Sequence, residues 1–235
     1  MNKLVAQIAH DVNNPVGNSL MYSQMLDEIL NDLKNEYQNG EIEQAIEFNQ
    51  NIKLALNSLT GILEAWVTGH HIAAGTHKFE KQALDPSVML NKAIGETGIY
   101  TTRKRIKILK EWDESVPPVY TDLKVFQRIL ENMVMLMVIF ATYEDTLRFI
   151  ISDQGDKVGI SMEDSYTDPR QALQDRFTGK EPWKDGEVLN EGVLKPAGYG
   201  LKFCGIALTE LNAEPDVTPS ELGGLKFSFK LPKAD

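Results

Sequence analysis

The chain has 235 residues, of which 42% are hydrophobic and 25% charged, and its formal net charge at pH 7 is −10. This composition is ordinary for a globular protein with a buried core, and the negative charge argues against nucleic-acid binding because nucleic-acid phosphates would be repelled. The longest apolar run, residues 133–141, is shorter than the roughly 20 residues of a membrane-spanning helix, and the single cysteine excludes an intramolecular disulfide.

Apolar residues recur at three- and four-residue steps from Leu4 to about Tyr37, which predicts a long first helix. Near its start, residues 8–16 read IAHDVNNPV, so a histidine stands beside an acid with Asn-Pro one turn further on. Pro15 lacks the N–H that would bond the carbonyl of Asp11, and a bend in the helix is therefore expected there.

A second helix is predicted from Ile42 to about Gly69, after a turn at residues 38–40. Two helices of this length cannot bury both apolar faces by themselves. A second hairpin from another copy of the chain would complete a four-helix bundle, so a homodimer is expected. We assign residues 1–75 to this helical domain.

The remaining residues, 76–235, predict a domain in which helices interleave with a mostly antiparallel sheet. Residues 106–109 alternate as a strand, and Asp122 can cap a helix that follows the Pro117–Pro118 break. Two alternating segments joined by a Gln-Gly-Asp turn predict a hairpin, and a last strand is expected near the C-terminus. The predicted fold class is therefore α+β, a helical hairpin followed by an α/β sandwich. The two strands of the hairpin are expected at residues 147–152 and 158–162, and the last strand at residues 225–231.

The pattern of residues 10–15 resembles the H-box, H-[DE]-x-x-[NT]-P, of the dimerisation and phosphotransfer domain of two-component histidine kinases. The resemblance implies that His10 is phosphorylated and that Asp11 accepts a hydrogen bond from its imidazole. It implies that Asn14 holds an attacking water or a phosphoryl oxygen. A short motif alone equally fits an ordinary surface histidine on an amphipathic helix. Receiver-docking candidates follow on the next turns: Gly17, Asn18 and Met21.

The second domain resembles the ATPase-like sandwich of the same kinases, whose motifs hold Mg-ATP. Asn132 fills the first position of the N-box, but Leu136 stands where a metal-binding asparagine is expected and Ile139 where a lysine is usual. A leucine cannot ligate magnesium, which needs oxygen ligands. In the D-x-G-x-G motif Asp164 remains, but residues 165–168 lack the glycines that bring the backbone close to a nucleotide.

Residues 177–180 resemble the phenylalanine segment before the ATP lid, and residues 180–197 would be the lid. Residues 198–201 then resemble the start of the glycine-rich turn at which a helix N-terminus faces phosphate, although Lys202 replaces the third glycine. Glycines at the entry of an ordinary structural helix look the same. The resemblance implies a weak or vestigial nucleotide site formed by Asn132, Asp164, Gly198 and Gly200.

An H-box beside a decayed ATP site resembles the dimeric histidine phosphotransferases, which relay phosphoryl groups between receiver aspartates. The expected partners are a second copy of the chain and a response-regulator receiver domain, including that of a hybrid kinase. No cofactor is expected, and no metal either, because the histidines near residue 70 lack metal-ligand spacing. The sequence start lacks a signal-peptide pattern, so a cytoplasmic protein is expected. Two alternatives stay open: an active kinase core that uses Mg-ATP, and a dimeric adaptor without chemistry.

Overall fold

The computed structural model describes residues 2–37, 40–112, 116–165, 177–178 and 194–234; among these, side chains are not described for 2–15, 51, 54–55, 58, 62 and 194–199. The chain forms two compact units, Met1–Val67 and Thr68–Asp235. The division lies upstream of the boundary at residue 75 that the sequence predicts. None of the helices in the described part of the chain is long and apolar enough to cross a membrane.

The first unit is an antiparallel helical hairpin, as predicted. Helix α1 covers Asn2–Glu36 and α2 covers Gly40–Ala73, so the end of α2 belongs to the second unit. Helix α1 is continuous through Pro15. Along α1 the buried side chains recur every seven residues at Val16, Ser23 and Leu30, which is the spacing of one seam of a coiled coil.

The second unit combines a five-stranded sheet with helices and confirms the predicted α+β fold class. The strand order is β2-β4-β5-β7-β6, in which only β2 and β4 are parallel, and β1 and β3 form a separate antiparallel pair. The strands are β1 Lys81–Leu84, β2 Lys107–Glu111, β3 Val119–Asp122, β4 Thr146–Asp153, β5 Lys157–Asp164, β6 Asp216–Pro219 and β7 Leu225–Pro232. The helices are α3 Pro86–Glu96, α4 Gly98–Arg103, α5 Leu123–Phe140 and α7 Leu194–Glu210.

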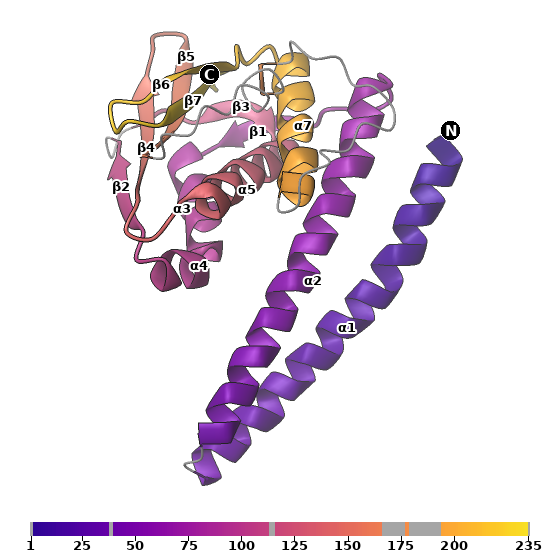
Figure 1. Ribbon diagram of the computed structural model, residues 1–235. Coiled ribbons are helices and arrows are strands. Elements are labelled where there is room, and N and C mark those ends of the chain that lie inside the picture. The colour runs from indigo at the N-terminus through magenta and orange to yellow at the C-terminus, as the bar shows by residue number, and fades with distance from the viewer. Residues whose placement is uncertain (1, 38–39, 113–115, 166–176, 179–193, 235) are drawn as a thin grey trace. The chain divides into compact units, whose positions relative to one another are not determined.

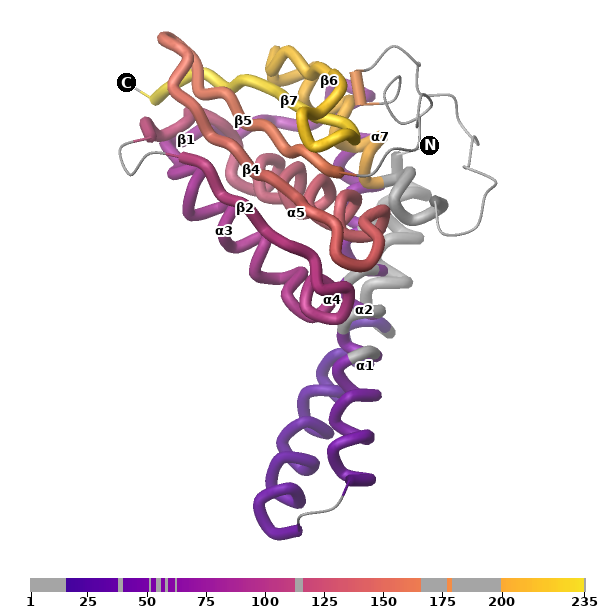
Figure 2. Tube along the Cα trace, turned by 60° about the vertical axis from the view of Figure 1, so that its left-hand side comes forward, coloured from indigo at the N-terminus to yellow at the C-terminus, as the bar shows by residue number. Residues whose placement is uncertain are grey.

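Helices α3, α5 and α7 cover one face of the five-stranded sheet (Figures 1 and 2). The core lies between these layers, because alternate residues of β4 and β7 point into it. Phe149 of β4 and Phe227 of β7 are fully buried there, and Phe203 of α7 is fully buried as well. The predicted hairpin of β4 and β5 and the predicted last strand, β7, are confirmed.

Both ends of α5 are capped by charged side chains, those of Asp122 directly before the helix and of Lys104 from α4's C-cap. Asp122 caps its N-terminus as predicted, because its carboxylate accepts the N–H groups of Val125 at 3.0 Å and Glu80 at 2.8 Å. At the other end, the Lys104 ammonium donates to three carbonyl oxygens of the last turn, between residues 138 and 141. These contacts fix the helix that carries Asn132 and Leu136.

A charged ladder crosses the sheet on the face turned away from the helices. Arg148 of β4, Glu163 of β5 and Lys226 of β7 are paired in register. The Glu163 carboxylate, 1% exposed, accepts bonds from Arg148 at 2.5 Å, Lys226 at 3.2 Å and the Ser220 hydroxyl at 3.0 Å. Burial alone would raise the pKa of Glu163, but these bonds outweigh it and hold the pKa below its ordinary value.

Replacement of Glu163 with glutamine is expected to lower the free energy of unfolding by about 2–4 kcal/mol at pH 7, because Arg148 loses a buried partner. Since the native pKa is depressed, the carboxylate contribution is complete above the ordinary value of 4.5 and is lost as pH falls through the native pKa. Urea melts from pH 7 to pH 3 should show the two proteins converging below about pH 4.5. Glu221→Gln, which alters an exposed partner of Arg148, is the control and should change little at any pH; an equal loss in both variants would contradict the argument.

Candidate functional site

Helix α1 carries residues 10–15, for which the sequence predicts an H-box, within continuous helical backbone. The side chains of His10, Asp11 and Asn14 lie outside the described residues, so their predicted roles stay predictions. Helical spacing places residues 10, 14, 17 and 21 on one face of α1, since residues three and four apart are neighbours.

The three receiver-docking candidates are all exposed in the hairpin. Gly17 and Asn18 are at the surface, and Met21 is 47% exposed. Nothing lies within 4 Å of the point where a Cβ on Gly17 would stand. A glycine inside a helix costs roughly 1 kcal/mol relative to alanine, and within this chain no described contact requires it. The surface beside residue 17 is therefore open to a partner.

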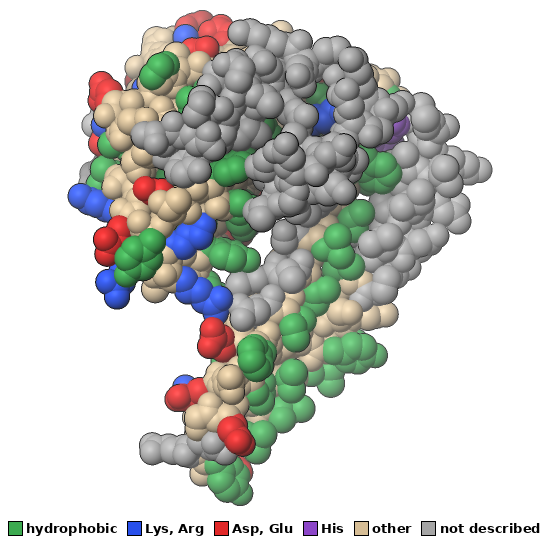
Figure 3. Space-filling view, viewed as in Figure 1, with side chains coloured by type: hydrophobic (Ala, Val, Ile, Leu, Met, Phe, Trp, Pro, Cys, Tyr) green, Lys and Arg blue, Asp and Glu red, His purple; other side chains and the backbone are tan. Residues whose placement is uncertain are grey.

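The hairpin leaves an apolar stripe uncovered, visible as green side chains along it in Figure 3. We call this set the exposed stripe. Its members on α1 follow three- and four-residue steps, so they share a face. A run of this size is more than the isolated apolar side chains normal on a monomer surface. The exposed stripe comprises Tyr22, Leu26, Ile29 and Leu33 of α1, Tyr37 directly after it, Met25 beside them, and Phe48, Ile52 and Leu59 of α2.

Two of the predicted nucleotide-site residues meet where α5 packs on α7. The Asn132 amide donates to the carbonyl of Arg128 in its own helix at 2.8 Å. A Cβ built on Gly200 would lie 2.3 Å from Asn132 Oδ1 and 2.9 Å from Asn132 Cγ, so a larger residue at position 200 would force the Asn132 side chain to shift. Gly200 therefore leaves room for Asn132 against α7, which is a structural reason for the glycine.

Asp164 ends the central strand β5, and its side chain is only 1% exposed. Its carboxylate accepts the N–H of Leu225 at 2.9 Å, and its main-chain carbonyl accepts the N–H of Gly224 at 3.1 Å. These bonds tie the end of β5 to the start of β7. Leu225 is predicted from the sequence only as the start of the last strand, and the Gly223-Gly224 pair before it is the one local signal of a close approach.

The described residues do not fit a magnesium–nucleotide complex. Leu136 is 2% exposed and forms part of the apolar side of α5, where a metal would need an oxygen ligand. Asn132 and Asp164 are already engaged within the protein, and no cluster of three metal-ligating side chains occurs among the residues that the structure describes.

The glycine-rich segment lies inside a helix. Helix α7 begins at Leu194, about one turn before the start that the glycines suggest, so the sequence-based placement of a helix N-terminus at Gly198 is wrong. Only the N–H groups of the first turn of a helix are free to bind phosphate, and those of Gly198 and Gly200 lie beyond it. The surroundings of Gly198 and most of the predicted lid are outside the described residues.

Phe177, which the sequence places just before the lid, is fully buried. Its ring packs edge-on against Phe227 of β7, with the ring centroids 5.3 Å apart. This contact anchors the segment on the sheet and is explained by packing alone.

Replacement of Gly200 with alanine tests whether Asn132 and Gly200 are coupled. The clash should outweigh the roughly 1 kcal/mol that alanine gains over glycine in a helix, giving a net destabilisation of about 1–2 kcal/mol. In an Asn132→Ala background the two closest atoms, Oδ1 and Cγ, are gone and only the Cβ contact at 3.2 Å remains, so the same substitution should be clearly less destabilising. Thermal melts of the parent, the two single variants and the double variant complete a double-mutant cycle. Gly95→Ala, at a helical site with nothing within 4 Å, should stabilise in both backgrounds; equal effects of Gly200→Ala in both would refute the coupling.

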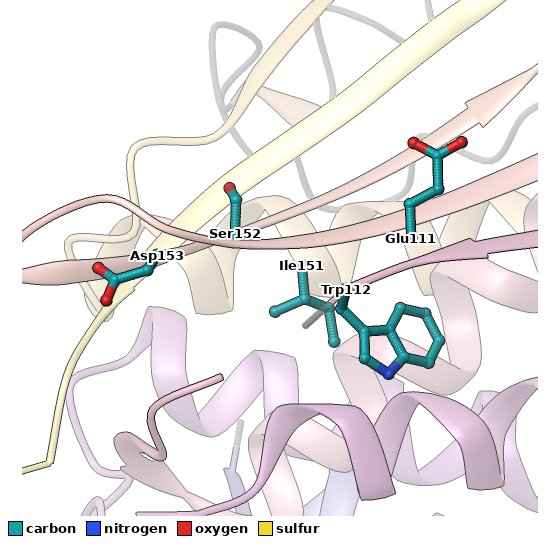
Figure 4. A pocket seen from close by; sticks show the side chains of 5 residues that line it. All are labelled: Glu111, Trp112, Ile151, Ser152 and Asp153. Carbon is teal, nitrogen blue, oxygen red and sulfur yellow. The ribbon is translucent and has the colours of Figure 1, made fainter. Parts of the chain in front are cut away.

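The described surface has a shallow cavity of about 490 Å³ at the end of β2 and β4. Glu111, Trp112, Ile151, Ser152 and Asp153 line it. In Figure 4, Glu111 and Ser152 point to one side of the sheet edge and Trp112 and Ile151 to the other. None of the predicted site residues lines this cavity, so it does not serve the predicted chemistry.

Comparisons with known proteins give matches at the level of structure. Full-length ShkA, solved in complex with AMPPNP, matches 100% of this chain with a TM-score of 0.67 and 17% identity, and the chain spans 46% of that protein. The chain has a histidine kinase fold. The catalytic domain of the histidine kinase ThkA, in a nucleotide-free form, matches 66% of this chain and 97% of its own length, with a TM-score of 0.53 and 17% identity.

The Acinetobacter baumannii histidine kinase AdeS matches 92% of this chain and 98% of its own length, with a TM-score of 0.55 and 10% identity. No protein-family model and no curated protein matches the chain. At identities this low the likeness establishes the histidine kinase fold, including the sandwich that the sequence predicts. The likeness does not assign the substrates or ligands of the matched proteins to this chain.

Proposed function

We propose that this protein is a two-component phosphorelay protein that carries a phosphoryl group on His10 and exchanges it with the aspartate of response-regulator receiver domains. One observation carries the proposal: in a chain of histidine kinase fold with an H-box, the residues that would bind Mg-ATP are used in internal contacts. A relay needs the histidine and a place for the receiver to dock. It does not need a nucleotide site.

The proposed step is a phosphoryl transfer between two side chains. A nitrogen of the neutral His10 imidazole attacks the aspartyl phosphate of the receiver, a P–N bond forms, and the P–O bond to the aspartate breaks to release its carboxylate. The receiver supplies Mg²⁺, so this chain needs no metal of its own. Asp11 accepts the N–H of the ring and keeps the other nitrogen basic, and Asn14 orients a phosphoryl oxygen or water. The reverse step passes the group to a second receiver.

The exposed stripe supports assembly as a homodimer. Two hairpins that bring their stripes together would bury these side chains in one four-helix core, which isolated hairpins cannot do. The receiver would then dock on α1 beside Gly17, Asn18 and Met21, which are exposed in the hairpin.

The test compares two phosphoryl donors with the purified full chain. A receiver domain phosphorylated in advance is expected to transfer label to the protein, whereas Mg-ATP labelled at the γ-phosphate is expected to transfer none. Isothermal titration with Mg-ATP should also show no binding. Failure to accept label from a panel of receivers, together with a failure to label from ATP, would favour the adaptor alternative.

A second candidate function is an active histidine kinase core. It is favoured by the match over the whole chain to ShkA, a protein solved with AMPPNP. Label that moves from Mg-ATP to His10 would establish this function in place of the relay.

A further inference from the structure

Four polar residues form a cluster in the seam between α1 and α2. Asn49 of α2 is 2% exposed and Ser23 of α1 is 4% exposed, so both lie deep in the hairpin. Asp27, one turn after Ser23, forms a half-buried ion pair with Lys53, one turn after Asn49; because the helices are antiparallel, these two residues lie on opposite sides of the Ser23–Asn49 pair. The neighbouring layers of the same seam are apolar, with Val16 and Leu30 buried on either side along α1.

Asn49 uses its whole side-chain amide across the seam. Its oxygen accepts the Ser23 hydroxyl at 2.6 Å. Its nitrogen donates to the Ser23 carbonyl at 2.6 Å and to the Asp27 carboxylate at 2.7 Å. The second Asp27 oxygen accepts the Lys53 ammonium. The described polar atoms of this cluster therefore satisfy one another, and each of these bonds joins α1 to α2.

We propose that this polar cluster, Ser23, Asn49, Asp27 and Lys53, selects a single axial register of α1 along α2. Leucine and isoleucine layers fit one another in many registers, because any apolar side chain can fill the next hole. The polar cluster fits in one register only. A shift of α2 by seven residues would place Ile42 or Leu56 opposite Ser23 and leave buried polar groups without partners.

This role differs from a contribution to stability. Replacement of a buried polar network by apolar residues of similar size often leaves the free energy of unfolding unchanged or raises it. What the replacement removes is the unique pairing of the helices. In this hairpin the network also sets the axial position of α1 relative to α2. It therefore fixes where the His10 end of α1 lies along the hairpin, and it keeps the α1 and α2 parts of the exposed stripe aligned.

The test measures the register directly in the full chain. Spin labels are placed at the exposed positions Gln24 of α1 and Asn57 of α2, each changed to cysteine; burial raises the pKa of the native Cys204 thiol and keeps it unreactive. Labelled protein is diluted in excess unlabelled protein so that double electron–electron resonance reports the intrachain distance. A slip of seven residues moves one helix by about 10 Å along the other.

The parent protein is expected to give one narrow distance. Ser23→Ala with Asn49→Leu should give additional distances or lose the intrachain distance, at an equal or higher melting temperature. Gln50→Leu, which adds a similar apolar group at the next, exposed position, should keep the parental distance. One narrow, parental distance in the double variant would overturn the proposal, and so would a lower melting temperature, because the network would then serve stability.

A second pair of substitutions covers the case in which the first variant does not fold. Asp27→Leu with Lys53→Leu removes the half-buried ion pair, where folding tolerates the change more easily. It is expected to add slipped distances as well. A parental distance in this folded variant would by itself contradict a register role for the ion pair.

Discussion

Replacement of His10 with glutamine is expected to abolish phosphoryl transfer from a phosphorylated receiver to this protein. Glutamine keeps a similar length and helix propensity, but its amide nitrogen is not a nucleophile and cannot form the P–N bond. Loss of the attacking group should lower the transfer rate by at least about 10³-fold. The measurement is acid-labile label on the protein during a time course with a labelled receiver.

Substitutions at Asp11 and at a histidine outside the motif separate the proposed roles of the H-box residues. Asp11→Asn should still accept label but about 10²-fold more slowly, because the imidazole loses the carboxylate that orients it. His70→Gln, the same change at a histidine of α2, should leave the rate unchanged. If His10→Gln retained label, another residue would be the acceptor and the relay would not use the H-box. Circular dichroism should be the same for all three variants.

The sequence predicted the helical hairpin, the cap at Asp122 and the β4–β5 hairpin because each depends on local patterns. Apolar periodicity identifies long helices, and alternation around a turn identifies paired strands. The short strand β3 was missed because it directly follows Pro117 and Pro118, which mark a chain break in a local analysis. Its partner β1 lies far away in the sequence, and pairing of this kind leaves no local signal.

The candidate nucleotide site shows the same limit at the level of side chains. Substitution of the metal ligand by Leu136 was readable from the sequence, but the contacts that occupy Asn132 and Asp164 were not. Each depends on a partner far along the chain, Gly200 in one case and Leu225 in the other. The polar cluster of the hairpin was missed for a related reason: Ser23 and Asn49 look like surface residues until the two helices are placed in register.

Replacement of Ile29 with glutamate is expected to convert the proposed dimer into a monomer. Ile29 is 55% exposed in the single chain and lies in the middle of the exposed stripe on α1. Burial of such a side chain contributes about 1.5–3 kcal/mol, and a symmetric dimer loses this contribution twice. The two introduced carboxylates must also be desolvated or remain unburied. A loss of at least about 4 kcal/mol corresponds to roughly 10³-fold weaker association.

Sedimentation velocity over a range of protein concentrations measures this change. Asn31→Glu adds the same charge to α1 at an exposed position outside the stripe, so it should remain dimeric. Because Ile29 is not part of the seam with α2, the monomeric variant should keep its helical content and the intrachain register set by Ser23 and Asn49. A dimer of unchanged affinity in Ile29→Glu would mean that a second copy does not cover the stripe. Monomers in both variants would instead indicate that net charge, and not the apolar surface, controls association.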